Sequence, residues 1–429
     1  MESLHCMISK AVELREFEGI RVDNGVAALS HLFYADDAII MGVWSEENIN
    51  KVARVLRVFH LCSGLKIYIH KSHLFGIGVN EGEVVSMASV LGYRVGSIPF
   101  EYLGIRVGAN MNRVCHWNSV VEAIQNRLST WKANTLSMGG RLTLLKSVLS
   151  SIPIYYLSLY KAPVKVIDKI ESMMKKILWA GSSNGNKVYW VAWETVCTTK
   201  KDGGLGVSRL KDVNAALIAK WVWRFKVEKD ALWRNVVEQI HEGRGNWDML
   251  PVKRGISGCW KTIVNFVENM KIQGMQIQQL VRCKVGSGES ARFWTDLWIG
   301  SEVLKKRWPC LYKHDSNKGY AINERIRWIA DGIQFTAQWR RFPVSVEAIS
   351  EMQDMDRLLN TFAAWGLADS WVWNDGKDGT FSVANFKKLL RQDRGVSRES
   401  KLKWDKWVLL KVNLVVWRAE LVTNQGCAY

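Results

Sequence analysis

Two adjacent carboxylates, Asp36 and Asp37, are the residues whose types and spacing most directly suggest chemistry in this chain. They lie between two apolar runs, where two like charges are unfavourable unless a positive group binds them. A divalent cation is the natural partner, because Mg²⁺ prefers oxygen ligands and is often held by one or two carboxylates together with phosphates. Two such ions can assist an in-line phosphoryl transfer. The alternative is an Asx-type turn whose aspartates are solvated.

The flanking residues predict a β-hairpin with both carboxylates at its tip. An apolar run extends from Leu29 to Tyr34 and a second one from Ala38 to Gly42, which is typical of strand, tight turn and strand. Neighbouring residues of an extended chain point to opposite faces. We therefore expect unequal roles for the two carboxylates, with Asp36 as the direct metal ligand.

Capping and turn residues predict further elements around this hairpin. Ser45 is a favourable N-cap, and Ser63-Gly64 is a typical helix stop. The expected elements are a helix over 1–15, a hairpin with its turn at 23–25, a helix over 46–61, a strand over 65–69, a helix over 81–91 and a strand over 379–383.

Residues 111–180 combine helical spacing with a strong excess of positive charge. Apolar residues recur on one side of a helix expected over 117–132, and two more helices are expected over 141–149 and after Pro163. The stretch contains ten Lys or Arg residues but three acidic ones. Aromatic residues alternate with these cations, a combination that suits nucleic-acid binding. Solvated helix surfaces can have the same composition.

The composition of the whole chain points in the same direction. Its 429 residues include 59 Lys or Arg and 41 Asp or Glu, a formal net charge of +18. This excess favours a polyanionic partner, most commonly nucleic acid, although a solvated basic surface is the alternative. The eight cysteines contain no CxxC pair and are expected to be reduced thiols. No apolar run reaches the ~18 residues of a membrane helix, and the first residues, Met1–His5, have no basic region before an apolar core, so no secretory signal is expected. The localisation is left unknown: intracellular, in nucleus or cytoplasm.

The segment His31–Ala38, with its Tyr-Ala-Asp-Asp core, resembles the [FY]ADD box of reverse transcriptases from plant-type LINE (non-LTR) retrotransposons. Other segments are similar to later blocks of that family and occur in the same order. They are Ser63–Ile67 with Lys71-Ser72, Phe100–Gly104 with Gly108, Leu128–Lys132 with Leu136–Leu149, and Lys200–Leu210. The resemblance covers about residues 1–235, and a weaker one, from about Trp365, is to the zinc-binding domain appended to these enzymes.

The resemblance implies a role for each matching residue. Asp36 and Asp37 would be the catalytic carboxylates and Mg²⁺ ligands, with two ions in a complete site. Lys71 would bind the incoming nucleotide, and Tyr102, Leu103 and Gly104 would form the primer grip. The implied nucleic-acid contacts are Lys132, Arg141 and Lys146. The implied partners are an RNA template, a DNA primer and a dNTP, with no membrane; the oligomeric state is left open.

The implied fold is α+β. It would be a partial right-hand polymerase, with a palm hairpin and sheet fragment, a helical thumb and a mainly helical C-terminal region. The expected domains are a partial palm over 1–110, a thumb over 111–180, a mostly helical connection over 181–364, and a truncated zinc-binding domain over 365–429.

The implied function is that of an RNA-directed DNA polymerase, a nucleotidyltransferase of a retrotransposon. We expect the isolated chain to be inactive, because a further palm aspartate and the fingers would precede residue 1. Tyr68 and Arg106 also replace the usual Asn and Pro of their blocks. No zinc is expected, because the chain ends at Tyr429 before the Cys and His ligands of the family. The alternative is a non-catalytic nucleic-acid-binding remnant of a retroelement.

Overall fold

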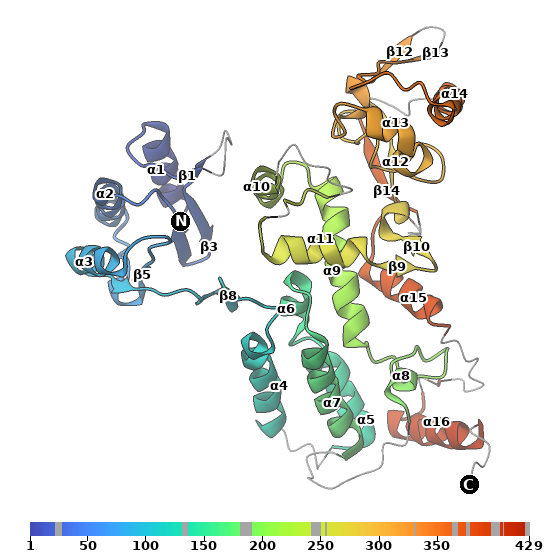
Figure 1. Ribbon diagram of the computed structural model, residues 1–429. Coiled ribbons are helices and arrows are strands. Elements are labelled where there is room, and N and C mark those ends of the chain that lie inside the picture. Colours follow the sequence, from blue (N-terminus) through green and yellow to red (C-terminus); the bar gives the residue numbers. More distant parts are fainter. Residues whose placement is uncertain are drawn as a thin grey trace. The chain divides into compact units, whose positions relative to one another are not determined.

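The computed structural model describes most of the chain as helices and short strands (Figure 1). The described residues are 1–21, 28–130, 136–180, 191–241, 250–253, 255–329, 332–362, 368–374, 378–395, 404–405 and 407–424. Each sheet within these ranges has two strands. The expected α+β class is therefore confirmed, whereas the finer expectation of a partial right-hand polymerase is not.

The chain divides into two compact units. Unit 1 comprises Met1–Ala109 and Asn235–Glu242, and unit 2 comprises Asn110–Arg234 and Gly243–Tyr429. The four-part division expected from the sequence stays a prediction.

Unit 1 is built from three main helices and short paired strands. Its elements are α1 (Glu2–Glu13), β1 (Ile20–Arg21), β2 (Ala28–Leu29), β3 (His31–Tyr34), β4 (Asp37–Ile40), α2 (Glu46–Ser63), η1 (Ile69–Lys71), β5 (His73–Leu74), α3 (Glu81–Leu91), β6 (Arg94–Val95), β7 (Phe100–Tyr102) and β8 (Ile105–Val107). Helix α10 (Leu232–His241) belongs to unit 1 from Asn235 onward.

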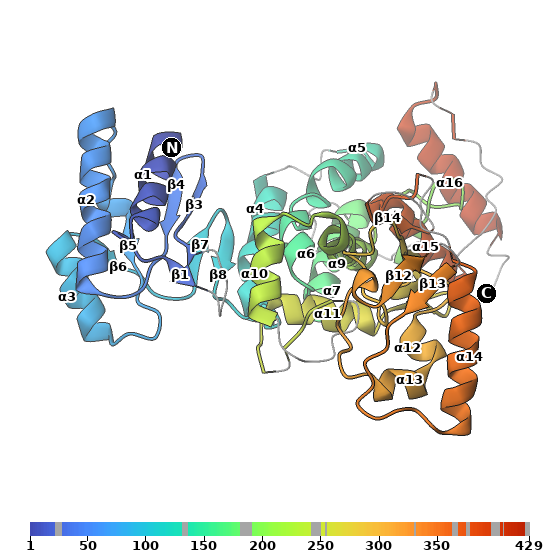
Figure 2. The same cartoon turned by 90° about the horizontal axis from the view of Figure 1, so that it is seen from above.

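The core of unit 1 lies between α1 and α2. Leu4 and Ile8 of α1 pack with Phe17 and with Phe59 of α2. Figure 2 shows α1 between α2 and the β3–β4 hairpin. The ends of α2 are set by local chemistry, because Ser45 Oγ accepts a hydrogen bond from the Asn48 amide at 3.1 Å and Gly64 takes a positive φ of 72°. Both ends match the sequence prediction to within two residues.

Unit 2 begins with helices and continues with a mixed region. Its elements are η2 (Val114–Trp117), α4 (Asn118–Thr130), α5 (Met138–Leu144), the π-turn η4 (Leu145–Leu149), α6 (Ile154–Leu159), α7 (Val164–Ala180), α8 (Trp193–Val196), α9 (Leu210–Val227), α11 (Cys259–Glu268), β9 (Lys271–Ile272), β10 (Met275–Gln276), η5 (Ile277–Leu280), β11 (Val281–Lys284), α12 (Leu304–Arg307), α13 (Pro309–His314), η6 (Ile322–Glu324), β12 (Ile326–Ile329), β13 (Gly332–Phe335), α14 (Val346–Asn360), β14 (Ser370–Trp373), α15 (Val383–Asp393) and α16 (Leu410–Asn424).

Helix α9 is the central helix of unit 2. It is buried over most of its circumference and packs against α6, α7, α11 and α15 (Figure 1). Its Asn214 is buried and links three backbone groups: the Nδ2 group donates to Leu157 O and Tyr160 O, each at 2.8 Å, and Oδ1 accepts from the Ala162 amide at 2.9 Å. Because these groups would otherwise be buried without partners, Asn214 fixes the link between α6 and α7 against α9.

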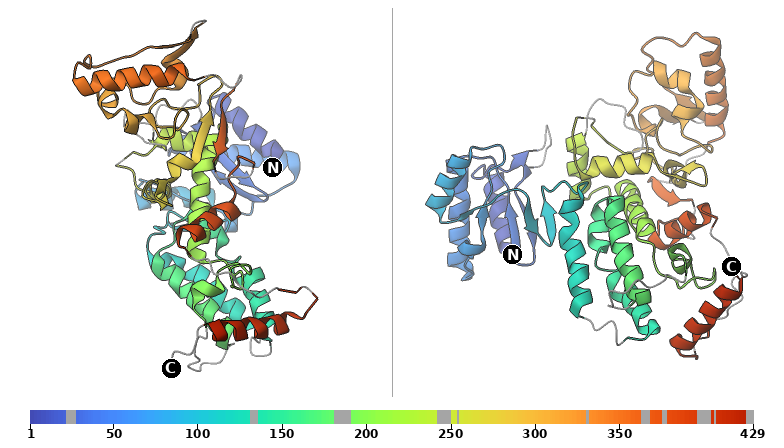
Figure 3. Two further views of the ribbon diagram at one scale, coloured as in Figure 1. Left: turned by 90° about the vertical axis from the view of Figure 1, so that its right-hand side faces the viewer. Right: turned by 60° about the horizontal axis from the view of Figure 1, so that its bottom comes forward.

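A second part of unit 2 has an aromatic core. Phe293, Trp294, Trp298, Trp308 and Tyr320 are all nearly inaccessible to solvent within one cluster. Helix α14, the orange helix of Figure 3, packs against α13 and contributes Ala348, Met355 and Leu359 to this cluster. The short aromatic segment that the sequence shows at 291–298 is therefore a core segment.

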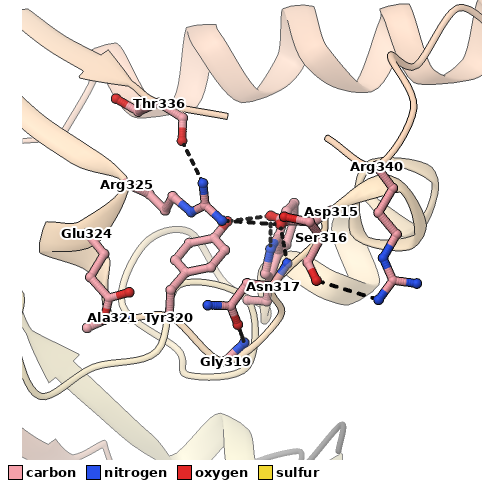
Figure 4. Close-up of polar contacts among 11 residues, drawn as sticks. Asp315, Ser316, Asn317, Gly319, Tyr320, Ala321, Glu324, Arg325, Thr336 and Arg340 are labelled. Atoms are coloured by element: carbon pink, nitrogen blue, oxygen red, sulfur yellow. Dashed lines mark hydrogen bonds and ion pairs between the residues drawn. The ribbon is translucent and has the colours of Figure 1, made fainter. Parts of the chain in front are cut away.

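Two carboxylates organise the loops of this region. Asp315 is fully buried and accepts hydrogen bonds from Trp294 Nε1 at 2.9 Å and Tyr320 OH at 2.7 Å, with the Arg325 guanidinium at 3.5 Å (Figure 4). Asp369, just before β14, accepts bonds from three backbone amides and one hydroxyl of the loop that follows β11. Strands β11 and β14 pair although they are far apart in sequence. Because Asp369 precedes β14 and binds the loop that follows β11, its hydrogen bonds stabilise this pairing.

Several local predictions differ from the structure. The strand expected at 65–69 is wrong: Leu65 and Tyr68 are exposed and have no strand partner among the described residues, so the apolar pattern alone does not form a strand. The strand expected at 379–383 is also wrong, because α15 already begins at Val383. The turn expected at 23–25 lies outside the described residues. The helical character expected for 111–180 is confirmed by α4, α5, α6 and α7.

Candidate functional site

The acidic pair lies at the tip of a hairpin, as the sequence predicts. Strand β3 pairs with β4 in antiparallel register, with Tyr34 opposite Asp37, so Ala35 and Asp36 form the turn. Ala35 has a φ of 49°, a left-handed conformation that is unfavourable for a residue with a side chain. Asp36 and Asp37 are both exposed. The hairpin therefore presents two carboxylates to solvent at one end.

The expected primer-grip residues form a second tight hairpin in unit 1. Tyr102 ends β7, and Leu103 and Gly104 make the turn into β8 with φ values of 49° and 74°. Two successive positive φ values are typical of a type I′ turn. Burial and the nearby negative charge of Asp37 both raise the pKa of the Tyr102 phenol. The structure therefore brings Asp37 and Tyr102 into electrostatic reach of one another.

Lys71, the residue with an implied nucleotide-binding role, lies on the surface of unit 1 next to a tyrosine ring. It ends the single turn η1 and is exposed, with its ammonium 5.4 Å from the centre of the Tyr68 ring. This contact is a cation–π interaction with an exposed ring. The nucleotide-binding role of Lys71 stays a prediction, as do the roles of the two hairpins.

In unit 2, helix α7 presents a stripe of lysines. Lys165, Lys169 and Lys176 are exposed, and their spacing of four and seven residues places them on one face of the helix over about 16 Å. The opposite face is buried through Val166, Ile170, Met174 and Ile177. Among the described residues none of the three lysines forms an ion pair. We call these three residues the lysine stripe.

The acids of the same helix leave this charge largely uncompensated. Glu171 is buried and accepts a hydrogen bond from the Leu210 amide at 2.8 Å. Burial raises the pKa of Glu171, which reduces its tendency to carry a negative charge. Asp168 is the exposed acid of α7. The exposed face of α7 is therefore basic.

The three cations predicted to contact nucleic acid differ in their settings. Lys132 lies outside the described residues. Arg141 Nε donates to the carbonyl of Leu136 at 3.1 Å, so part of its guanidinium serves the start of α5. Lys146 is half-buried in η4, and burial together with the charge of Lys200 lowers the pKa of its ammonium.

Sequence reasoning missed two features of this surface. The lysine stripe follows from counting positions i, i+4 and i+11 on α7, a signal that the sequence contains. The proximity of Lys146 and Lys200 has no local signal, because the two residues belong to separate elements.

Neither a metal cluster nor a membrane helix is found in the described ranges. No group of three or more His, Cys, Asp or Glu side chains is placed to hold a metal ion there. No helix in the same ranges has the length and hydrophobicity required to cross a membrane.

Comparisons with known proteins give two relatives. No protein-family model matches the chain. A protein of Arabidopsis thaliana named "Putative ribonuclease H protein" is 34% identical over 281 residues, which is 65% of this chain and 43% of the relative. An uncharacterized mitochondrial protein of the same plant is 28% identical over 154 residues, which is 36% of this chain and 96% of that relative. The chain thus spans less than half the length of the first relative.

The first relative overturns the function implied by the YADD-type motif. Its name denotes a ribonuclease H, which is a hydrolase and not a nucleotidyltransferase. The expectations of reverse transcriptase family membership, RNA-directed DNA polymerase function and nucleotidyltransferase activity are therefore wrong. The physical reason is that a short acidic hairpin supplies metal-binding chemistry that different phosphoryl-transfer reactions can share. The name ribonuclease H describes that relative, of which this chain covers 43%, and the second relative is uncharacterized.

Proposed function

We propose that this chain binds nucleic acid, as part of a ribonuclease H-like protein, through the basic helical surface of unit 2. The observation that carries the proposal is the lysine stripe on α7, with three exposed cations on one face and no ion-pair partner among the described residues. Clustered cations of this kind bind phosphates and release the counterions of nucleic acid. The net charge of +18 supports the same partner class.

The name of the first relative indicates which kind of ligand to expect. Since it is named for a ribonuclease H, nucleic acid is the natural partner to carry over to this chain. An exposed lysine stripe contacts the backbone and reads no base sequence. The proposed binding is therefore independent of sequence and sensitive to salt.

We also propose that Asp36 and Asp37 bind Mg²⁺ weakly in unit 1. Two exposed carboxylates at a turn can supply one or two of the oxygen ligands that Mg²⁺ takes, with water or a phosphate completing the shell. The chemistry that such an ion supplies is neutralisation of phosphate charge. The residues fit a partial site rather than a complete cage.

The test of nucleic-acid binding is a salt titration with a labelled 20-base-pair RNA–DNA hybrid. Replacement of the three lysines of the stripe by Gln should reduce the slope of log K against log salt by about 2 to 3, since each phosphate contact contributes about 0.9. The matched control carries Lys211→Gln, Lys313→Gln and Lys388→Gln, three exposed lysines of unit 2 on separate helices. The control should change the slope by less than 1.

Two results would contradict the proposal. Wild-type chain that does not bind the hybrid at low salt would exclude nucleic-acid binding. Equal losses in the stripe variant and in the control would show a general attraction to net charge, without a binding face on α7.

A further inference from the structure

A glycine-containing loop in unit 2 brings two further cations together. The loop runs from Thr199 to Gly206 between α8 and α9, and Gly203 and Gly206 have φ values of 78° and 68°. The carbonyl of Gly203 accepts a hydrogen bond from Trp417 Nε1 of α16 at 2.8 Å. At Gly204 a Cβ would lie 2.4 Å from the carbonyl oxygen of Thr195, so only glycine fits there. The loop is therefore held in one conformation by its neighbours.

Two lysines lie at this loop, one in η4 and one within the loop itself. Lys146 of η4 is half-buried, and its ammonium lies 3.4 Å from the position that a Cβ at Gly206 would occupy. Lys200, within the loop, has its ammonium 4.3 Å from the centre of the Trp404 ring. Trp404 comes from the segment that precedes α16. Three stretches of chain, distant in sequence, thus meet at one place.

The charges at this place are not balanced by the described residues. Neither Lys146 nor Lys200 forms an ion pair there. The nearby carboxylate of Asp202 is engaged locally, since its Oδ2 accepts a hydrogen bond from Thr199 Oγ1 at 2.5 Å. The Lys146 ammonium lies against the loop that contains Lys200, and burial and, secondarily, the positive charge of Lys200 lower the pKa of Lys146. An anion between the two ammonium groups would offset this charge.

The Trp404 ring contributes by orienting Lys200. An ammonium above an indole face is attracted by the ring quadrupole, so the flexible lysine side chain is restricted to one direction. The covered face of the indole is not available to stack on a base. Trp404 therefore acts as a positioning residue rather than a stacking platform.

We propose that Lys146 and Lys200 form a phosphate-binding subsite that holds one backbone phosphate of the bound nucleic acid, with Trp404 directing Lys200 toward it. The proposal rests on the proposed nucleic-acid binding and adds residues outside the lysine stripe. A lysine is suited to this role as a compact point charge, and two of them can share one phosphodiester group. The ligand chemistry is that of a phosphate oxygen, which a free phosphate ion also offers.

The experiment compares three proteins in the RNA–DNA hybrid titration. The first carries Lys146→Gln with Lys200→Gln, the second carries Trp404→Leu, and the control carries Lys211→Gln with Lys388→Gln. The double variant should lose at least tenfold in affinity at 50 mM salt and reduce the salt slope by about 1, since one phosphate contact contributes about 0.9. Trp404→Leu should weaken binding about threefold with little change of slope, because both charges remain. Far-UV circular dichroism verifies that each variant is folded.

The subsite and the proposed nucleic-acid binding can fail independently in this experiment. Unchanged binding by the double variant, while the lysine-stripe variant loses affinity, would overturn the subsite and leave nucleic-acid binding intact. Wild-type chain that does not bind the hybrid would overturn both.

A titration with inorganic phosphate shows whether the subsite binds a phosphate of nucleic acid or a small phosphate compound. The subsite predicts that millimolar phosphate competes with the hybrid for the wild type and not for the double variant. If phosphate raises the melting temperature of the wild type alone while the hybrid binds both proteins equally, the subsite belongs to a small phosphate compound and the assignment to nucleic acid is wrong.

Discussion

Asp37 at the tip of the β3–β4 hairpin lies within electrostatic reach of Tyr102 at the end of β7. The two residues belong to different hairpins, and each hairpin has a two-residue turn that contains positive φ values. The negative charge of Asp37 therefore disfavours the phenolate form of Tyr102.

The first prediction concerns this pair. Burial and the charge of Asp37 both raise the pKa of Tyr102. Asp37→Asn removes the charge and should lower that pKa, because the phenolate no longer faces a carboxylate. The measurement is a pH titration of the Tyr102 ¹³Cζ signal by NMR. Glu101→Gln, an exposed neighbour on the same strand, is the control and should leave the titration unchanged; an equal decrease in both variants would argue against a specific Asp37 effect.

The second prediction concerns Mg²⁺ at the acidic tip. Mn²⁺, a paramagnetic substitute for Mg²⁺, should broaden the amide signals of Asp36 and Asp37 at low metal concentration, and excess Mg²⁺ should reverse the broadening. The double variant Asp36→Asn with Asp37→Asn should lose it, since amides are weaker ligands than carboxylates. Glu81→Gln with Glu83→Gln removes two exposed acids of α3 and should leave it unchanged. Broadening that persists in the first variant would exclude this site.

The third prediction concerns Asp369. Burial alone would raise the pKa of this carboxyl, but hydrogen bonds from the Ser290, Gly288 and Gly286 amides and from Ser290 Oγ outweigh it, and the pKa is lowered. A lowered folded-state pKa means that the stabilisation is complete above the unfolded pKa of about 3.9 and is lost as the pH falls through the folded value.

Asp369→Asn should therefore destabilise the β11–β14 region by about 2 to 3 kcal/mol at neutral pH, because hydrogen bonds to a charged acceptor are lost. The measurement is hydrogen exchange at the Gly286 and Gly288 amides. Asp378→Asn, an exposed acid after β14, is the control. Unaltered exchange in Asp369→Asn would contradict the anchoring role.

The fourth prediction concerns the buried pair of Lys226 and Asp296. The two side chains are 7% and 2% exposed, and Lys226 Nζ lies 2.5 Å from Asp296 Oδ1. Lys226→Met leaves a buried carboxylate without its partner and should cost about 3 to 5 kcal/mol of unfolding free energy. Adding Asp296→Asn to that variant should recover part of the loss. Urea unfolding followed by tryptophan fluorescence measures the free energy of unfolding of the two single variants, Lys226→Met and Asp296→Asn, and of the double variant. A loss in the double variant equal to the sum of the two single losses would argue against coupling between these residues.

Much of the local structure could be predicted from the sequence. The Ser45 cap and the Gly64 stop set the ends of α2, and the apolar runs on either side of the acidic pair set the β3–β4 hairpin. These signals act over a few residues, because caps, turns and helical periodicity depend on neighbouring side chains. The same reasoning failed at 65–69, where an apolar run lacks a partner strand within the described chain.

The sequence by itself determined the hairpin that carries Asp36 and Asp37, the helices of 111–180 and the positive charge of the chain. Only the tertiary structure decided that Asp37 lies within electrostatic reach of Tyr102, that Lys146 lies against the loop that carries Lys200, and that Lys200 lies over the Trp404 ring. Local periodicity carries no information on such encounters, because they depend on how many distant side chains pack at once. The sequence motif also led to the wrong enzyme class, since the same acidic chemistry serves more than one reaction on phosphates.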